Sequence, residues 1–383
     1  MRMASAFDFD HLVPRRGTGS LKWDKFPALD PFWVADMDFT SPPAVLEALQ
    51  ERVAHGVLGY ALPHPGLIEA LLDYMQQRHG LAVQENEIVH LGGLVCALSM
   101  IAQAIGDPGG KVMTCTPIYP PFIGVHHDAD KKCITVPHTQ VNGRWEFDWA
   151  TMEAAVTPDT AIFLLSNPQN PLGRVFTREE MEQLASFCDR HDMVLVSDEI
   201  HCDLILDEAA TPHICAAGLP DELQKRIITL LAPSKTYNIA GMGYAFAVIR
   251  DDSLRRKFTQ AKGHTQPEIG CLSYYTAEAA YRHGEPWRQE LITYLAKNRD
   301  TVTDFVRTRM PGCEIPNIEA TYLAWIDCRA LEKENPADFF EKEAALYLSD
   351  GAYFGAPGHV RFNYGCSHEC MLEGLEKMAN VIA

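Results

Sequence analysis

The sequence predicts an α/β protein with a large domain, built on a mostly parallel central sheet, and a smaller α+β domain. Two patterns lead to this fold. Between residues 87 and 249, apolar runs of strand length alternate with amphipathic segments of helix length, which favours a doubly wound parallel sheet. Beyond residue 320, an alternating strand, a helix and a further strand have the character of a small α+β domain.

The chain has 383 residues, 47% of them hydrophobic and 22% charged, which is ordinary for a globular protein and long enough for two domains. We expect residues 1–42 to form an N-terminal arm that also belongs in part to the small domain. Residues 43–284 are expected to form the large domain, and residues 285–383 the small one.

The net charge of −18 argues against non-specific binding to nucleic acid or to anionic membranes. No apolar run approaches the length that spans a bilayer, and the first twenty residues lack the apolar centre of a signal peptide. Several of the eleven cysteines lie in apolar surroundings, as reduced core thiols do. We therefore expect a cytoplasmic protein without a disulfide framework.

The N-terminal arm is rich in aromatic residues, and residues 33–39 alternate like a short strand or an extended segment. A helix is expected to begin at Ser41, with the serine as its cap and prolines in its first turn. Tyr60 follows on a loop, where the pattern alone indicates an ordinary surface residue. A second amphipathic helix is predicted at 66–79.

A short strand at 87–91 leads through Gly92 and Gly93 into an apolar helix at 94–105. This order is typical of a phosphate site, because glycines let the backbone approach a ligand and a helix N-terminus offers unpaired N–H groups. Such glycine pairs also occur in simple turns, so the pattern alone leaves both interpretations open.

Tyr119 follows the next predicted strand, 111–115, and has a proline close on either side. A rigid aromatic ring at a strand end can stack on a planar cofactor, although an ordinary loop aromatic has the same pattern. A further strand is expected at 134–137 and a short helix within 145–156.

Three successive strands then end at residues that suit one chemistry: Asn170, Asp198 and Lys235. A helix at 177–191, capped by Thr177, separates the first two strands. Open α/β sheets bind ligands at the carboxyl ends of their strands. A lysine desolvated there becomes a nucleophile.

These strand ends resemble the fold-type I enzymes that use pyridoxal 5′-phosphate (PLP). A lysine forms a Schiff base with this cofactor, and an aspartate pairs with its pyridinium nitrogen. An asparagine in the position of Asn170 can donate a hydrogen bond to the phenolic oxygen of the ring.

The remaining elements are expected at 244–249 (a strand that continues the sheet), 270–283 and 286–310 (helices), 322–327 (a half-exposed strand), 336–349 (a helix) and 359–365 (a strand), with a closing helix. Arg361 lies within the last of these strands. An arginine there needs a carboxylate, which the substrate or a structural Asp or Glu could supply.

The resemblance extends over nearly the whole chain and is closest to the cystathionine β-lyase (cysteine C–S lyase) branch related to class I and II aminotransferases, the group typified by MalY and PatB. It is carried by Trp33-Val-Ala-Asp36-Met-Asp38-Phe39, His55-Gly-Val-Leu-Gly-Tyr60, Ser166-Asn-Pro-Gln-Asn170-Pro, Ser197-Asp-Glu-Ile-His201, Ser234-Lys235-Thr-Tyr-Asn238 and Val360-Arg361-Phe-Asn.

The resemblance implies α,β-elimination from L-cystathionine or related S-substituted cysteines, which gives a thiol (homocysteine from cystathionine), pyruvate and ammonia. It also implies that Lys235 is the Schiff-base lysine and the general base. The other implied roles are Asp198 at the ring nitrogen, Asn170 at the phenolic oxygen and near the substrate, Tyr119 stacked on the ring and near the substrate, His201 beside the cofactor, and Arg361 on the substrate carboxylate.

The phosphate is expected to bind the backbone near Leu94 and Val95, the hydroxyl of Ser234, and Tyr60 of a neighbouring subunit, which implies a homodimer. Two positions that often supply hydroxyl groups to the phosphate, Leu94 and Ala232, are apolar here.

Two other functions stay open. An aminotransferase would share these residues except His201, because those enzymes usually carry tyrosine there. A binding or regulatory protein without turnover is disfavoured, because it needs no nucleophile. Three further patterns are rejected as sites: Cys366, His368 and Cys370 as a metal cluster, His126, His127 and His264 as more than loop residues, and Gly241 and Gly243 as a dinucleotide fingerprint.

Overall fold

The computed structural model describes residues 6–263 and 268–382, so His264 lies outside the described residues. The helices are α1 (Leu21–Asp24), α2 (Pro43–His55), α3 (Pro65–His79), α4 (Leu94–Ala104), α5 (Pro120–Asp128), α6 (Trp149–Ala155), α7 (Arg178–Arg190), α8 (Asp252–Lys262), α9 (Cys271–His283), α10 (Glu285–Arg309), α11 (Pro336–Ala344) and α12 (His368–Ile382). No helix within the described ranges has the length and apolar character that crossing a membrane requires.

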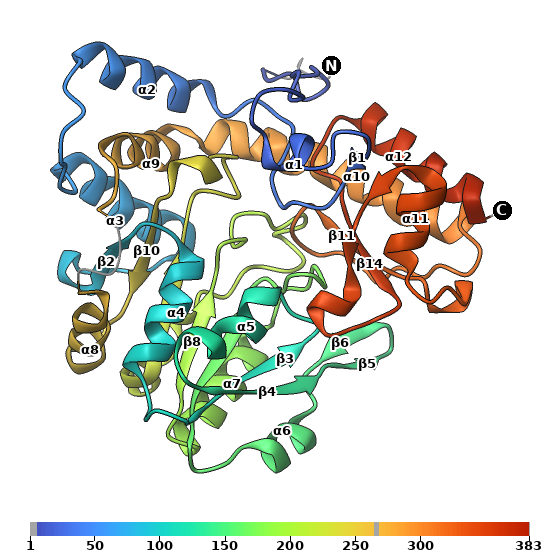
Figure 1. Ribbon diagram of the computed structural model, residues 1–383. Helices are drawn as coiled ribbons and strands as arrows, with labels where there is room; N and C mark the ends of the chain where they lie inside the picture. Colours follow the sequence, from blue (N-terminus) through green and yellow to red (C-terminus); the bar gives the residue numbers. More distant parts are fainter. Residues whose placement is uncertain (1–5, 264–267, 383) are drawn as a thin grey trace.

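The strands are β1 (Asp30–Pro31), β2 (Ile88–Leu91), β3 (Lys111–Thr116), β4 (Lys132–Pro137), β5 (Thr139–Val141), β6 (Arg144–Glu146), β7 (Thr160–Ser166), β8 (Val194–Asp198), β9 (Ile227–Leu231), β10 (Ala245–Val248), β11 (Leu323–Asp327), β12 (Leu346–Tyr347), β13 (Ser349–Asp350) and β14 (His359–Asn363). Figure 1 shows the elements from β2 (cyan) to β10 (yellow) beside the orange and red elements β11, α11, β14 and α12.

A seven-stranded sheet in the order β2-β10-β9-β8-β7-β3-β4 forms the centre of the large domain. All its strands run in one direction except β10, which is antiparallel to both β9 and β2. The predicted mostly parallel sheet is therefore confirmed. The predicted strand at 244–249 does continue the sheet, but in the opposite direction to its neighbours.

The central strands β7, β8 and β9 are buried on both faces, which is why they are almost continuously apolar. Leu164 and Val196 pack under α4, α5 and α8 on one face. Leu165 and Leu195 point to the other face, where α6 and α7 cover them. The sheet is thus held rigidly between two helical layers, and its strand ends are fixed points on which a site can be built.

The small domain contains the antiparallel sheet β11-β14-β13, and α10, α11 and α12 pack against one another and against its strands. Strand β1 of the N-terminal arm pairs with β12, so the arm lies against this domain, as Figure 1 also shows. Gly284 separates α9 from α10. The predicted domain limits themselves stay predictions.

Several local predictions were wrong. Ser41 does not cap α2, because its hydroxyl donates instead to the carbonyl of Asn238 at 3.0 Å. The strand at 322–327 is not half-exposed, since β11 is buried apart from Asp327. The helix expected at 336–349 ends at Ala344, because residues 346–350 pair with β1 and β14 instead.

Other elements were missed or placed too broadly. Within 145–156, only α6 is helical, since residues 144–146 form a hairpin with β5. Helices α5 and α8 were not predicted, although Asp251 caps α8 through the backbone N–H of Leu254. The predicted cap at Thr177 is confirmed as a reciprocal capping box with Glu180.

Candidate active site

Adjacent strands of the large sheet bring the predicted residues together. Strands β7, β8 and β9 are neighbours, and their register places Ser166 beside Asp198 and Asp198 beside Leu230. Because the three strands are parallel, the loops that follow them leave the sheet at the same edge. Asn170, Asp198 and Lys235 therefore lie at one site.

Arg361 reaches this site from the small domain. Its Nη1 donates to the side-chain oxygen of Asn170 at 3.0 Å. Its Nη2 donates to the carbonyl of Trp33 at 2.7 Å and to the hydroxyl of Ser349 at 3.2 Å. The site therefore lies where the two domains and the N-terminal arm meet.

Lys235 is the candidate nucleophile. Its Nζ donates to the carbonyl oxygen of Ala35 at 2.6 Å. Burial lowers the pKa of Lys235 to about 8, and the charge of Arg361 acts in the same direction, whereas Asp36 and Asp198 oppose it. Burial thus raises the fraction of neutral amine near neutral pH, and nucleophilic attack requires that form.

Asp198 is a buried carboxyl group without a cationic partner among the described residues. Burial raises the pKa of Asp198 to about 7, helped by the charge of Glu199 and opposed by the N–H of Ile200 and by Lys235. A buried carboxylate needs a compensating positive charge. Asp198 therefore suits a ligand that brings a protonated nitrogen.

Glu199, the next residue, is fully partnered. Its carboxylate accepts hydrogen bonds from the Ser197 hydroxyl at 2.8 Å, from His213 at 2.7 Å and from the Ala216 N–H at 2.8 Å. These contacts hold the pKa of Glu199 below its usual value even though the residue is buried. Glu199 is thus a structural group that fixes the loop after β8.

Arg361 is buried and has no carboxylate within ion-pair distance in the described part of the chain. Its Nε has no hydrogen-bond partner, and its guanidinium lies 4.9 Å from the centre of the Phe354 ring. Burial lowers the pKa of Arg361 to about 10. The structural ion pair left open by the sequence is absent here, so the guanidinium is available to an anionic ligand.

Tyr119 and His201 line the site. The N–H of Tyr119 donates to the Asn170 carbonyl at 3.1 Å, and burial raises the pKa of its phenol. Burial and the charges of Lys235 and Arg361 lower the pKa of His201 to about 3, so its ring is neutral. The Nδ1 atom of His201 is buried without a hydrogen-bond partner.

The first turn of α4 has the features of an anion site. Gly93 precedes it without a side-chain cap, and the N–H groups of Leu94 and Val95 have no acceptor within the described residues. A Cβ added to Gly92 would meet no atom within 4 Å, so the approach is open. The hydroxyl of Ser234 is likewise unbonded in the described part of the protein.

Tyr60 lies apart from these residues in the single chain. It is 99% exposed. Its predicted place at the site of a neighbouring subunit stays a prediction.

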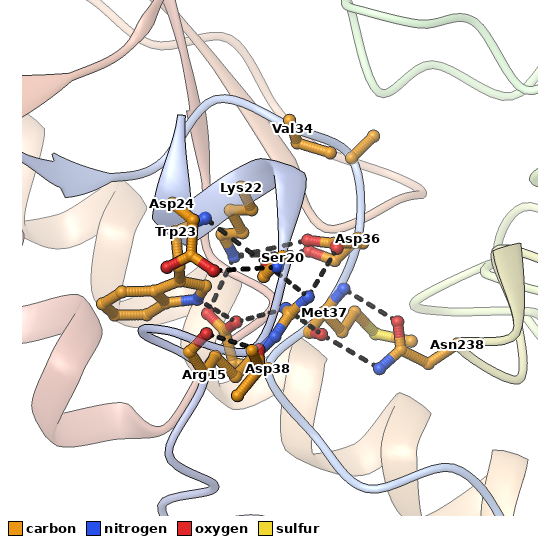
Figure 2. A network of polar contacts seen from close by, with 12 residues as sticks. Arg15, Ser20, Lys22, Trp23, Asp24, Val34, Asp36, Met37, Asp38 and Asn238 are labelled. Atoms are coloured by element: carbon orange, nitrogen blue, oxygen red, sulfur yellow. Dashed lines mark hydrogen bonds and ion pairs between the residues drawn. The ribbon is translucent and has the colours of Figure 1, made fainter. Parts of the chain in front are cut away.

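The segment 33–39 was not recognised as part of the site, beyond its contribution to the resemblance. It forms no strand, because side chains bond its backbone in place of a neighbouring strand. Figure 2 shows Asn238 paired with the N–H and carbonyl of Met37, at 3.0 and 2.9 Å. Asn238 follows Lys235 by three residues, so the loop that carries the lysine also holds the arm.

Charged groups fix the other side of this segment (Figure 2). Arg15 donates to Asp36 at 2.9 Å and to Asp38 at 2.7 Å. The buried Lys22 contacts Asp38 at 2.7 Å, and Trp23 donates to the same carboxylate at 2.8 Å. The alternation of Asp36 and Asp38 was visible in the sequence, but their basic partners lie in an irregular arm that predicts no contact.

The pattern of Cys366, His368 and Cys370 lies at the start of α12. Among the described residues, no group of three or more His, Cys, Asp or Glu side chains is arranged to hold a metal ion. His368 begins α12 and pairs through Nδ1 with the side-chain oxygen of Asn298 at 3.0 Å.

Comparison with known proteins identifies the family. Residues 33–378 match the family described as aminotransferase class I and II. The chain belongs to this family. It is 36% identical to cystathionine beta-lyase PatB of Bacillus subtilis (strain 168), over 97% of this chain and 98% of that protein. The predicted family and fold are therefore confirmed.

Solved structures agree with this assignment. The crystal structure of OvoB has a TM-score of 0.95 and 37% identity, with 98% of this chain and 99% of that chain covered. The PLP-bound C–S lyase from Staphylococcus hominis has a TM-score of 0.92 and 32% identity, with 99% of both chains covered. The C–S lyase chemistry and the PLP cofactor expected from the sequence match the printed name of the Staphylococcus hominis enzyme.

Proposed function

We propose that this chain is a PLP-dependent C–S lyase that cleaves L-cystathionine or related S-substituted cysteines by α,β-elimination. The products are a thiol, pyruvate and ammonia. The observation that carries the proposal is the position of Lys235, whose amine has a lowered pKa and is close enough to Asp198 and Arg361 to interact with both charges. Each of these two groups is buried and has no opposite charge within ion-pair distance among the described residues.

The residues fit PLP at three points. Asp198 is a buried carboxylate that needs a protonated nitrogen, Lys235 is an amine suited to an aldehyde carbon, and the open N-terminus of α4 suits a phosphate. When bound, PLP supplies an electron-accepting ring for the substrate α-carbon.

The side chains of this chain supply binding and proton transfer. Arg361 can grip the α-carboxylate with two parallel hydrogen bonds, which orients the Cα–H bond. The freed amine of Lys235 takes the Cα proton as general base. Tyr119 forms a wall of the site beside Asn170. A thiolate leaves far more readily than an alkoxide, which is why sulfur substrates suit this site.

We also propose that the enzyme is a homodimer and that Tyr60 completes the neighbouring site. Exposed apolar side chains gather around it: Val57, Leu58 and Leu62. Such a patch favours burial against another chain. All eleven cysteines are free, which supports a reducing, cytoplasmic location.

The test is direct. Purified protein is examined for the visible absorbance of bound PLP and then assayed for pyruvate with L-cystathionine, with Lys235→Ala in parallel. Pyruvate from the wild type and none from the variant supports the lyase. Bound cofactor without pyruvate, but with amino transfer to a keto acid, favours the aminotransferase alternative. Absence of any cofactor band contradicts both.

A further inference from the structure

One backbone carbonyl in the active site accepts hydrogen bonds from two side chains. The oxygen of Ala35 lies 2.6 Å from Nζ of Lys235 and 2.9 Å from the hydroxyl of Tyr322. Tyr322 is fully buried and immediately precedes β11 in the small domain, whereas Lys235 follows β9 in the large domain. The N-terminal arm thus connects a small-domain phenol to the reactive amine.

The segment that carries this carbonyl is fixed on both sides of Ala35. Nδ2 of Asn363 donates to the carbonyl of Val34 at 2.6 Å and to that of Asp36 at 2.8 Å. Ala35 therefore lies between two anchored neighbours, and its oxygen cannot turn away from Lys235 without breaking these bonds. The position of the shared carbonyl is therefore fixed by the surrounding hydrogen bonds.

We propose that Tyr322 is a positioning residue that favours the neutral, nucleophilic amine of Lys235 by sharing the Ala35 carbonyl with it. A carbonyl oxygen that accepts from the lysine alone stabilises the ammonium form over the neutral amine. A phenol that donates to the same oxygen occupies one of its lone pairs and weakens that preference. The inference rests on the role given to Lys235 in the proposed function.

Among the other ionisable groups near Lys235, only Arg361 also favours the neutral amine. The charged and titratable side chains that face Lys235 come from the arm, from β8 and its loop, and from β14: Asp36, Asp198, His201 and Arg361. The two carboxylates favour the ammonium form, and only the arginine opposes them by charge. Burial raises the pKa of Tyr322, so its hydroxyl remains a neutral donor throughout the working pH range.

Tyr322→Phe removes this donor and keeps the ring. Tyr364→Phe is a matched control, because Tyr364 is also fully buried and its hydroxyl donates to a backbone carbonyl, that of Thr321, at 2.9 Å. Both variants lose one phenol–carbonyl bond in the same domain. Only the first loses a bond to the oxygen that holds Lys235.

The readout is the titration of Lys235 in cofactor-free full-length protein. Trace acetylation with acetic anhydride across a pH series, followed by mass spectrometry, reports the midpoint for that lysine. In Tyr322→Phe we expect the midpoint to rise by about half to one pH unit and PLP capture at neutral pH to slow about three- to tenfold. Tyr364→Phe should match the wild type in both measurements.

Two outcomes overturn the inference: an unchanged midpoint in Tyr322→Phe, or an equal shift in both variants, which would indicate a general loosening of the small domain. Failure of the proposed function is distinguishable from either outcome. If wild-type protein does not capture PLP at Lys235, the function fails, while the acetylation midpoints still test the effect of Tyr322.

Discussion

The guanidinium of Arg361 and the side-chain oxygen of Asn170 are joined by a hydrogen bond of 3.0 Å that crosses between the two domains. Arg361 belongs to β14 and Asn170 to the loop after β7. A substrate carboxylate bound to Arg361 would therefore be placed beside the residue expected at the phenolic oxygen of the cofactor. The hydrogen bond between Arg361 and Asn170 would thereby connect the residue that binds the substrate with the residue that contacts the cofactor ring.

Replacing Arg361 should lower the activity of the enzyme without lowering its stability. Arg361→Met is expected to lower kcat/KM for cystathionine at least about 100-fold, because the paired hydrogen bonds to the carboxylate are lost. The free energy of unfolding should stay unchanged or rise by about 1 kcal/mol, since the buried charge has no carboxylate partner among the described residues. Pyruvate assays and urea denaturation measure the two effects.

Arg288→Met is the control for this experiment. Arg288 is equally buried, but it contacts Glu285 at 2.7 Å and Glu208 at 3.1 Å. Its loss should cost about 2 kcal/mol of stability and leave kcat/KM near the wild-type value. Equal destabilisation by both substitutions would contradict our view of Arg361 as a charge held ready for substrate.

The cofactor-free protein should become less stable as the pH rises from about 4 to about 7 through the contribution of Asp198. Its folded pKa, about 7, lies above its usual value of 3.8, so the folded state binds more protons in this window and stability falls with pH. The change is on the order of a few kcal/mol. In Asp198→Asn, the part of the fall in stability that Asp198 contributes should be absent.

Urea denaturation of the wild type and of Asp198→Asn at several pH values measures how the free energy of unfolding of each protein changes with pH. Buried histidines such as His138 have lowered pKa values and change stability in the opposite sense, but they are present in both proteins and cancel in the comparison. Parallel stability curves for the wild type and Asp198→Asn would show that Asp198 is already compensated in the cofactor-free protein.

The phosphate proposal can be tested through one backbone N–H group. Leu94 is the first residue of α4, where proline is well tolerated, and Gly93 has the extended backbone, with ψ 162°, that precedes proline. Leu94→Pro should weaken PLP binding about tenfold or more by removing a donor to the phosphate. Leu94→Ala loses the same side-chain packing and keeps the N–H. Equal PLP affinities of the two variants in a titration would show that the N–H of Leu94 does not bind the phosphate.

Subunit mixing tests the role of Tyr60. Tyr60→Ala should lose affinity for PLP, and Lys235→Ala should be inactive. A dimer of one chain of each kind would contain one site with both native residues, so mixing the two proteins under conditions of subunit exchange should restore pyruvate formation. Activity that stays at the sum of the separate proteins would place Tyr60 outside the neighbouring site.

The sequence predicted the parts of the fold that carry strong local signals. The apolar strands that end near Asn170, Asp198 and Lys235 form adjacent parallel strands, and the Thr177 cap is present. The direction of β10 was not predictable, because the apolar pattern of a strand is the same in either direction. Residues 345–349 were taken as helix because the pairing of this segment with β1 and β14 is a long-range contact.

The proposed catalytic side chains were visible in the sequence because their chemistry depends on residue type. The Ala35 carbonyl was not, because every residue has such a group and no side-chain pattern distinguishes this one. Tyr322 was passed over for the related reason that its partner is a backbone atom 287 residues away.

The hydrogen bonds to the arm require a fixed number of residues between Trp33 and Ala35. Arg361 donates to the carbonyl of Trp33, and Lys235 donates to that of Ala35, two residues further along the chain. The spacing of these two carbonyls along the arm therefore sets the positions of the arginine and the lysine relative to each other. Side chains along it can be exchanged while both contacts persist. A single inserted or deleted residue between Trp33 and Ala35 would shift one contact against the other and disable the enzyme without altering any catalytic group.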